Sequence, residues 1–182
     1  MTATTFFVCM FGLVVFIASS VWPRQAGTPL YQTEDGFTAI TYDGLRMAVE
    51  SRRVLLIDVR NVTEVMKFGK IPTSYVLPWI PAGSIPRGIL YRETYYLGKS
   101  LSPPNAVHEL KEAWRLEDKD FQETYGFARP DPPGQGVIIT CRSGRRARVA
   151  INYLRPLGYD KIILYAGSYL DWVANNGALE YP

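Results

Sequence analysis

A cysteine followed by arginines is the part of this sequence whose residue types could do chemistry. An apolar, β-branched run, Val137–Thr140, ends at Cys141, and a short loop with Gly144 leads into a helical pattern. Four arginines follow the cysteine within seven residues: Arg142, Arg145, Arg146 and Arg148. Helix-terminal amides and nearby cations favour the thiolate, the nucleophilic form of cysteine. The pattern therefore predicts a nucleophile that attacks an anionic substrate, against the alternative of a buried cysteine beside a solvated arginine face.

The charge balance points to a small anionic ligand. The chain has 20 basic and 17 acidic residues, and removing the four arginines after Cys141 leaves 16 against 17. The basic excess is therefore confined to one loop and its helix, and no long basic tract predicts a nucleic-acid partner. With only two cysteines, Cys9 and Cys141, and one histidine, His108, we expect no disulfide framework, no metal site and no cofactor. His108 is expected on a solvent-facing helical turn.

Two buried strands position this loop. Val54–Ile57 is a continuous apolar run that ends at Asp58, as Val137–Thr140 ends at Cys141. Such runs are typical of buried parallel strands, and parallel sheets bind ligands beyond the carboxyl ends of their strands. We therefore expect Asp58 and Cys141 at one edge of the sheet.

Strand and helix patterns alternate along the rest of the chain. Further strands are predicted at 37–41, 75–77 and 161–165. Helices are predicted after an Asp43 cap, at 62–68, in two pieces within 105–125, from the Cys141 loop to Leu157, and at 167–176. This alternation predicts an α/β fold with a mostly parallel central sheet flanked by helices.

The N-terminus predicts a separate segment. Residues 6–17 carry no charge, and Ala18 and Ser20 provide the small residues that a signal peptidase recognises. Extended to Trp22, the segment reaches the lower length limit for a membrane span. We expect residues 1–22 to be a signal peptide or a signal anchor, which predicts secretion or membrane association. Arg24 favours a cytoplasm-facing domain if the segment is an anchor, and the lack of Lys and Arg in residues 1–23 disfavours a mitochondrial presequence.

Four segments match the landmarks of a known family, in the right order. Cys141–Arg146 is similar to its six-residue active loop, and Leu56–Arg60, with Glu64 after it, is similar to its first landmark. Gly69–Pro72 resembles its Gly-His-Ile-Pro turn, with lysine in place of histidine, and Gly167–Trp172 matches its Gly-x-x-x-x-Trp landmark. Together they resemble the single-domain rhodaneses, which are thiosulfate sulfurtransferase-like proteins.

The resemblance divides the chain. Residues 121–130 are similar to the small animal type of this family, and the likeness extends over residues 37–177, which implies one rhodanese-like domain. Residues 23–36 are then expected as a linker and residues 178–182 as a tail. The segment 78–104, rich in Pro, Gly and Tyr, is expected to form a long ordered loop of undetermined role.

The resemblance also implies a reaction. Cys141 would attack the sulfane sulfur of thiosulfate or of a persulfide, become a persulfide, and pass the sulfur to cyanide or a thiol acceptor. Amides of the loop after Cys141 would bind the anion, with Gly144 permitting the turn. Arg142 and Arg145 would meet the donor at the rim, Arg146 would turn inward to anchor the loop, and Ser143 would either donate a hydrogen bond or act as a small loop residue.

Two further residues are implied as supports rather than as reacting groups. Asp58 would hold neighbouring loop amides, and Arg60 would pair with Glu64 on the following helix.

Two other functions are compatible with this predicted fold. A dual-specificity phosphatase requires arginine six residues after the cysteine, where this chain has Ala147; Arg146 is five residues after it. A non-catalytic rhodanese module for binding or redox sensing often lacks the cysteine, whereas Cys141 is present. The sequence determines neither the physiological donor and acceptor nor the oligomeric state.

Overall fold

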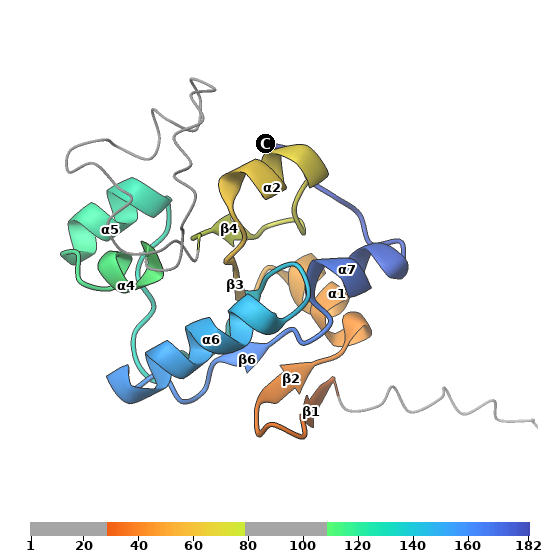
Figure 1. Cartoon of the computed structure of the whole chain (residues 1–182), viewed down its shortest axis with the longest axis horizontal. Coiled ribbons are helices and arrows are strands. Elements are labelled where there is room, and N and C mark those ends of the chain that lie inside the picture. Colours follow the sequence, from red (N-terminus) through yellow and green to blue (C-terminus); the bar gives the residue numbers. More distant parts are fainter. Residues whose placement is uncertain (1–28, 79–108) are drawn as a thin grey trace, which may run out of the picture.

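A six-stranded sheet forms the centre of the computed structural model, which describes residues 29–78 and 109–182 (Figure 1). The strands lie in the order β1-β2-β6-β5-β3-β4, and only β1 is antiparallel to its neighbour. Their bounds are β1 Leu30–Gln32, β2 Thr38–Ile40, β3 Leu55–Asp58, β4 Tyr75–Val76, β5 Val137–Thr140 and β6 Ile163–Leu164. The predicted α/β fold with a mostly parallel sheet is confirmed.

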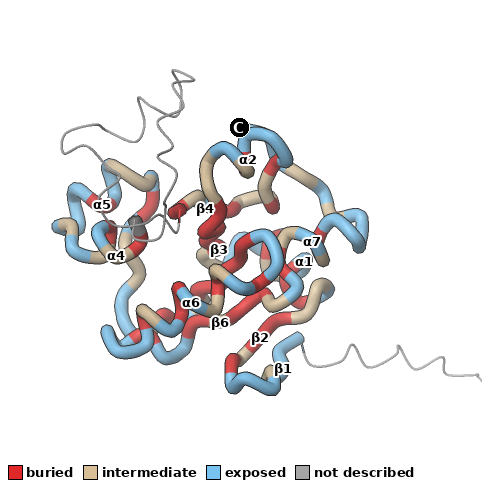
Figure 2. Tube along the Cα trace, in the orientation of Figure 1, coloured by how far each residue is buried: buried red, intermediate tan, exposed pale blue. Residues whose placement is uncertain are grey.

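Helices cover both faces of this sheet. Their bounds are α1 Tyr42–Ser51, α2 Val62–Phe68, α4 Glu109–Ala113, α5 Asp118–Tyr125, α6 Arg145–Leu154 and α7 Ser168–Ala174. Side chains of β5 alternate, so that Ile139 packs with α4, α5 and α6, and Ile138 packs with α1 and α7. Figure 2 shows the resulting band of buried strands between exposed helix surfaces. Each fully buried aliphatic side chain contributes about 1.5–3 kcal/mol by leaving water.

Local hydrogen bonds fix where the helices near the site begin. Helix α2 starts with a capping box, in which Asn61 accepts from the Thr63 amide at 3.0 Å and Glu64 accepts from the Asn61 amide at 3.2 Å. Helix α1 is capped by Thr41, whose hydroxyl accepts from the Gly44 amide at 3.2 Å. The predicted Asp43 cap is therefore wrong by two residues, and Asp43 lies in the first turn.

Two segments outside the periodic patterns also join the fold. Strand β1 lies within the stretch predicted as a linker and pairs with β2, although all three of its residues are exposed. Such a short, exposed strand carries no hydrophobic alternation, so its pattern gives no sign of it. In the predicted tail, the backbone of Glu180 exchanges hydrogen bonds of 2.8 and 2.9 Å with that of Lys70.

Several predictions fall where the structure is not described. The N-terminal segment 1–22, residues 79–104 and His108 all lie outside the described residues. Among the helices of residues 29–78 and 109–182, none has both the length and the apolar character that crossing a bilayer requires.

Candidate active site

The carboxyl ends of β3 and β5 meet at one edge of the sheet. Asp58 is in register with Thr140, so Cys141 lies one residue beyond the end of the paired strands. Both side chains are buried, with Asp58 0% and Cys141 1% exposed. The sequence prediction that these two residues share an edge is confirmed.

The loop after β5 directs a backbone amide toward the Cys141 sulfur. The amide of Gly144 donates to Cys141 Sγ at 3.1 Å, and the Ser168 hydroxyl lies 3.9 Å from the same atom. Gly144 has φ +84°, and a Cβ there would lie 2.2 Å from the Ala166 carbonyl oxygen. Glycine is therefore required, because a side chain would clash with a backbone atom and strain the left-handed turn.

Helix α7 secures this loop from the other side. The amides of Tyr169 and Leu170 donate to the carbonyls of Cys141 and Arg142, each at 3.0 Å. The first turn of α7 therefore fixes the backbone on which the thiol sits.

The arginines after Cys141 fall into two groups. Arg146 makes two hydrogen bonds to Glu64, of 2.5 and 2.8 Å, and thereby joins α6 to α2. Arg148 donates to Asp35 at 2.6 Å. Within residues 29–78 and 109–182, the exposed Arg142 and Arg145 have no carboxylate partner. These two guanidinium groups are available to an anion.

The Glu64–Arg146 pair keeps both groups charged. Burial would raise the pKa of the Glu64 carboxyl, but the hydrogen bonds and charge of Arg146 outweigh it and leave that pKa below its ordinary value. The hydrogen bond from Glu64 in turn raises the pKa of Arg146, and negative charge on Cys141 acts in the same direction. The positive charge of Arg146 is thus held near the sulfur.

The predicted pairing of Arg60 with Glu64 is wrong. Arg60 pairs with Asp58 instead, at 2.7 Å, and its backbone amide donates to the same carboxylate at 3.0 Å. Arg60 also donates to the carbonyl of Gly69 at 2.8 Å and lies over the Tyr169 ring. Burial raises the pKa of Asp58, and the hydrogen bonds of Arg60 oppose that rise. Because Asp58 is fully buried, it needs the nearest cation, which leaves Glu64 to Arg146.

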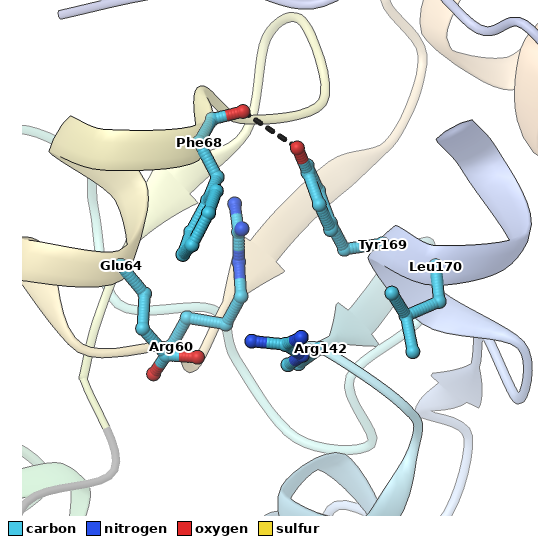
Figure 3. Close-up of a pocket in the computed structure, with 6 residues that line it drawn as sticks. All are labelled: Arg60, Glu64, Phe68, Arg142, Tyr169 and Leu170. Carbon is cyan, nitrogen blue, oxygen red and sulfur yellow. Dashed lines mark hydrogen bonds between the residues drawn. The ribbon is translucent and has the colours of Figure 1, made fainter.

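A pocket of about 160 Å³ opens beside this loop (Figure 3). Its lining residues come from three segments that meet here: Arg60, Glu64, Phe68, Arg142, Tyr169 and Leu170. Figure 3 shows the Tyr169 hydroxyl bonded to the Phe68 carbonyl, at 2.6 Å, which joins α7 to the end of α2.

Sequence reasoning missed the pocket residues Phe68, Tyr169 and Leu170, and it missed Ser168. Three of them lie within the Gly167–Trp172 landmark, in which only Gly167 and Trp172 are fixed by the motif. Trp172 is indeed buried, and its indole donates to the Ala178 carbonyl at 2.7 Å. The exposed Ser143 makes no hydrogen bond among the described residues. That same part of the chain contains no group of three side chains able to hold a metal ion.

Comparison with known proteins defines the class. The model of the rhodanese-like domain matches residues 41–175, and the chain belongs to this family. A Schizosaccharomyces pombe protein, "Putative thiosulfate sulfurtransferase, mitochondrial", is 36% identical over 121 residues, which are 66% of this chain and 64% of that one. The chain therefore spans slightly less than two thirds of this relative's length.

A budding yeast protein is similar in both sequence and structure. "Thiosulfate sulfurtransferase RDL2, mitochondrial" of Saccharomyces cerevisiae is 29% identical over 140 residues, covering 76% of this chain and 74% of that one. Its crystal structure gives a TM-score of 0.54 at 28% identity, over 82% of this chain and 99% of that one. These relatives confirm the predicted class of enzyme, a thiosulfate sulfurtransferase-like transferase.

The same relatives correct the predicted localisation. The apolar segment 1–22 led us to expect secretion or a membrane anchor, whereas both yeast relatives are mitochondrial proteins. The prediction rested on the hydropathy of residues 1–22 and on their lack of Lys and Arg, and the mitochondrial relatives overturn it.

Proposed function

We propose that the protein transfers a sulfane sulfur from thiosulfate or an organic persulfide to a thiophilic acceptor, through a persulfide on Cys141. The observation that carries this proposal is the Gly144 amide directed at Cys141 Sγ at 3.1 Å. A backbone donor aimed at sulfur stabilises negative charge on that atom. The Gly144 amide thus favours negative charge on this buried sulfur.

In the first step, the Cys141 thiolate attacks the outer sulfur of the donor. A bond forms between Sγ and that sulfur, the S–S bond of thiosulfate breaks, and sulfite leaves with the bonding electron pair. With a persulfide donor, the leaving group is the corresponding thiolate. The negative charge then rests on the outer sulfur of the Cys141 persulfide.

In the second step, an acceptor attacks the outer sulfur. Cyanide takes it as thiocyanate, and a thiolate takes it as a new persulfide; in both cases the electron pair of the broken S–S bond returns to Cys141. The enzyme regains its thiolate without a cofactor or an external oxidant.

The surrounding arginines divide this work. Arg142 and Arg145 are exposed and unpaired within the described ranges, so they are available to attract the anionic donor. Arg146 holds the start of α6 through Glu64 and keeps a positive charge near Sγ. Asp58 and Arg60 support the neighbouring loop through buried bonds, and Arg60 also lines the pocket.

The test uses the full-length chain, incubated with thiosulfate and cyanide. We expect thiocyanate formation by the wild type, and loss of at least ~10³-fold with Cys141→Ser, because a hydroxyl is a far weaker nucleophile than a thiolate. Without an acceptor, mass spectrometry should find one added sulfur atom on the Cys141 peptide and none on the Cys9 peptide. Equal turnover by both proteins, or no added sulfur, would overturn the proposal and favour a binding module.

A further inference from the structure

Ser168, the first residue of α7, has an unusual backbone conformation. Its φ is +56°, in the left-handed region that residues with a side chain rarely occupy, and the residue is fully buried. This conformation strains an L residue, and glycine would relieve the strain. The strain is retained at a position whose side chain faces the reacting sulfur.

The Ser168 hydroxyl has three partners. It accepts from the backbone amide of Cys141 at 3.2 Å, donates to the Tyr165 carbonyl at 2.8 Å, and lies 3.9 Å from Cys141 Sγ. The hydroxyl carries a single proton, so it can donate to only one of the last two atoms at a time. A neutral thiol is a weak acceptor, whereas a thiolate is a strong one.

We propose that Ser168 is a positioning residue of the sulfur-transfer site. Its hydroxyl holds the Cys141 backbone in place and turns its proton from the Tyr165 carbonyl to Sγ when the sulfur becomes negative. The inference rests on the proposed function in taking Sγ as the reacting atom. It adds a side-chain donor opposite the Gly144 amide, which the loop motif alone does not supply.

The Ser168 hydroxyl donates its hydrogen bond to Sγ at two points of the reaction. It stabilises the Cys141 thiolate before attack on the sulfur donor, and it stabilises the same thiolate when Cys141 becomes the leaving group of the second step. In the intervening persulfide the charge lies on the outer sulfur, so the hydroxyl returns to the Tyr165 carbonyl. No bond is made or broken by Ser168 itself.

Charged groups from several elements also act on this position. They are Arg142 in the loop, Arg146 on α6, Glu64 on α2, the buried pair Asp58 and Arg60 after β3, and Asp171 on α7, bonded to Tyr165. A substitution at Ser168 leaves all six in place. A pH-dependent change in sulfur reactivity that Ser168→Gly and Ser168→Ala share can therefore be assigned to the lost hydroxyl.

The experiment measures how fast iodoacetamide alkylates Cys141 in the full-length chain, followed by mass spectrometry so that Cys9 is counted separately. Ser168→Gly removes the hydroxyl and relieves the backbone strain; Ser168→Ala removes the hydroxyl and keeps the strain. Ser74→Ala is the matched control, because Ser74 is a buried serine whose hydroxyl donates to the Ile71 carbonyl at 2.7 Å, in the turn before β4.

We expect iodoacetamide to alkylate Cys141 about tenfold more slowly in both Ser168 variants than in the wild type near pH 6, because each variant loses one hydrogen bond to an anion. The deficit should shrink as the pH rises, because the thiol then ionises without help. Thermal unfolding should show Ser168→Gly to be more stable than Ser168→Ala, and Ser74→Ala should react like the wild type.

Three results would overturn the inference. They are a wild-type rate for Ser168→Gly, a deficit of the same size at every pH, and an equal pH-dependent deficit in Ser74→Ala. The thiocyanate assay is independent of alkylation. If both Ser168 variants show the expected alkylation deficit but the wild type takes no sulfur from thiosulfate, the role of Ser168 is supported and the proposed function fails.

Discussion

Two ion pairs lie at the same edge of the sheet and differ in almost every other respect. Asp58–Arg60 joins residues two apart in sequence, and both side chains are buried. Glu64–Arg146 joins residues 82 apart, and about a quarter of each side chain is exposed. The Asp58–Arg60 pair is local and lies at the end of β3. The Glu64–Arg146 pair joins helices α2 and α6 across the loop that holds the Cys141 thiol. The comparison suggests that one pair supports the fold and the other supports the reaction.

Breaking the buried pair should have the largest effect on stability. Arg60→Met leaves the Asp58 carboxylate buried without its partner, and removing one member of such a pair costs about 3–5 kcal/mol. Chemical denaturation of the full chain measures the loss. The double variant Asp58→Asn/Arg60→Met is the control, since it removes the stranded charge and should recover part of the stability. A single variant as stable as the wild type would contradict the structural role of this pair.

Breaking the second pair should affect turnover more than stability. Glu64→Gln removes the charge that holds Arg146, so we expect a decrease of about tenfold in kcat for thiocyanate formation, because misplacing a group near the reacting atoms slows the reaction. The loss of folding free energy should be only about 1 kcal/mol, because the pair is partly solvated. If Glu64→Gln lost as much stability as Arg60→Met while its kcat stayed unchanged, the assignment of one pair to the fold and the other to the reaction would be contradicted.

The same variant gives the pH dependence of the second pair. The folded pKa of Glu64 lies below its unfolded value, so its stabilising effect is present above the ordinary glutamate pKa of about 4.3 and is lost as the pH falls through the depressed value. The difference in unfolding free energy between wild type and Glu64→Gln should therefore shrink on acidification. A difference that grew at low pH would contradict the assigned direction.

The smallest effect is expected at Arg148, whose partner Asp35 is about half exposed. Arg148→Ala should leave the free energy of unfolding almost unchanged, and salt should reduce any remaining difference, because an exposed ion pair is screened. The KM for thiosulfate should not change, whereas Arg145→Ala should raise it, since Arg145 is proposed to meet the donor. Steady-state kinetics of both variants make the test, and a higher KM for Arg148→Ala would place Arg148 among the donor-binding residues.

The strands and the loop of this site can be predicted from the sequence, but the ion-pair partners of its charged side chains cannot. Val137–Thr140 is predictable because a buried parallel strand has apolar side chains on both faces, and Gly144 because the turn into α6 requires a positive φ. Glu64 has two arginines within reach in the folded chain. Only the position of α6, set by distant parts of the chain, decides between them.

Other features leave no pattern at all. Strand β1 exists because β2 offers it a partner, and its exposed residues show no period. Ser168 is unremarkable in the sequence, and its importance comes from a backbone angle and from the proximity of a cysteine 27 residues earlier. Both depend on tertiary contacts that a local pattern cannot encode.

Two sets of hydrogen bonds tie together the walls of the pocket. The Tyr169 hydroxyl is bonded to the carbonyl of Phe68, and two residues later the backbone of Lys70 is paired with Glu180. The end of α2 is thus bonded to α7, and the residue that follows Gly69 is bonded to the segment after α7. These ties hold α2 and α7 at a set separation across the pocket, so donors of different bulk must fit between the same two helices.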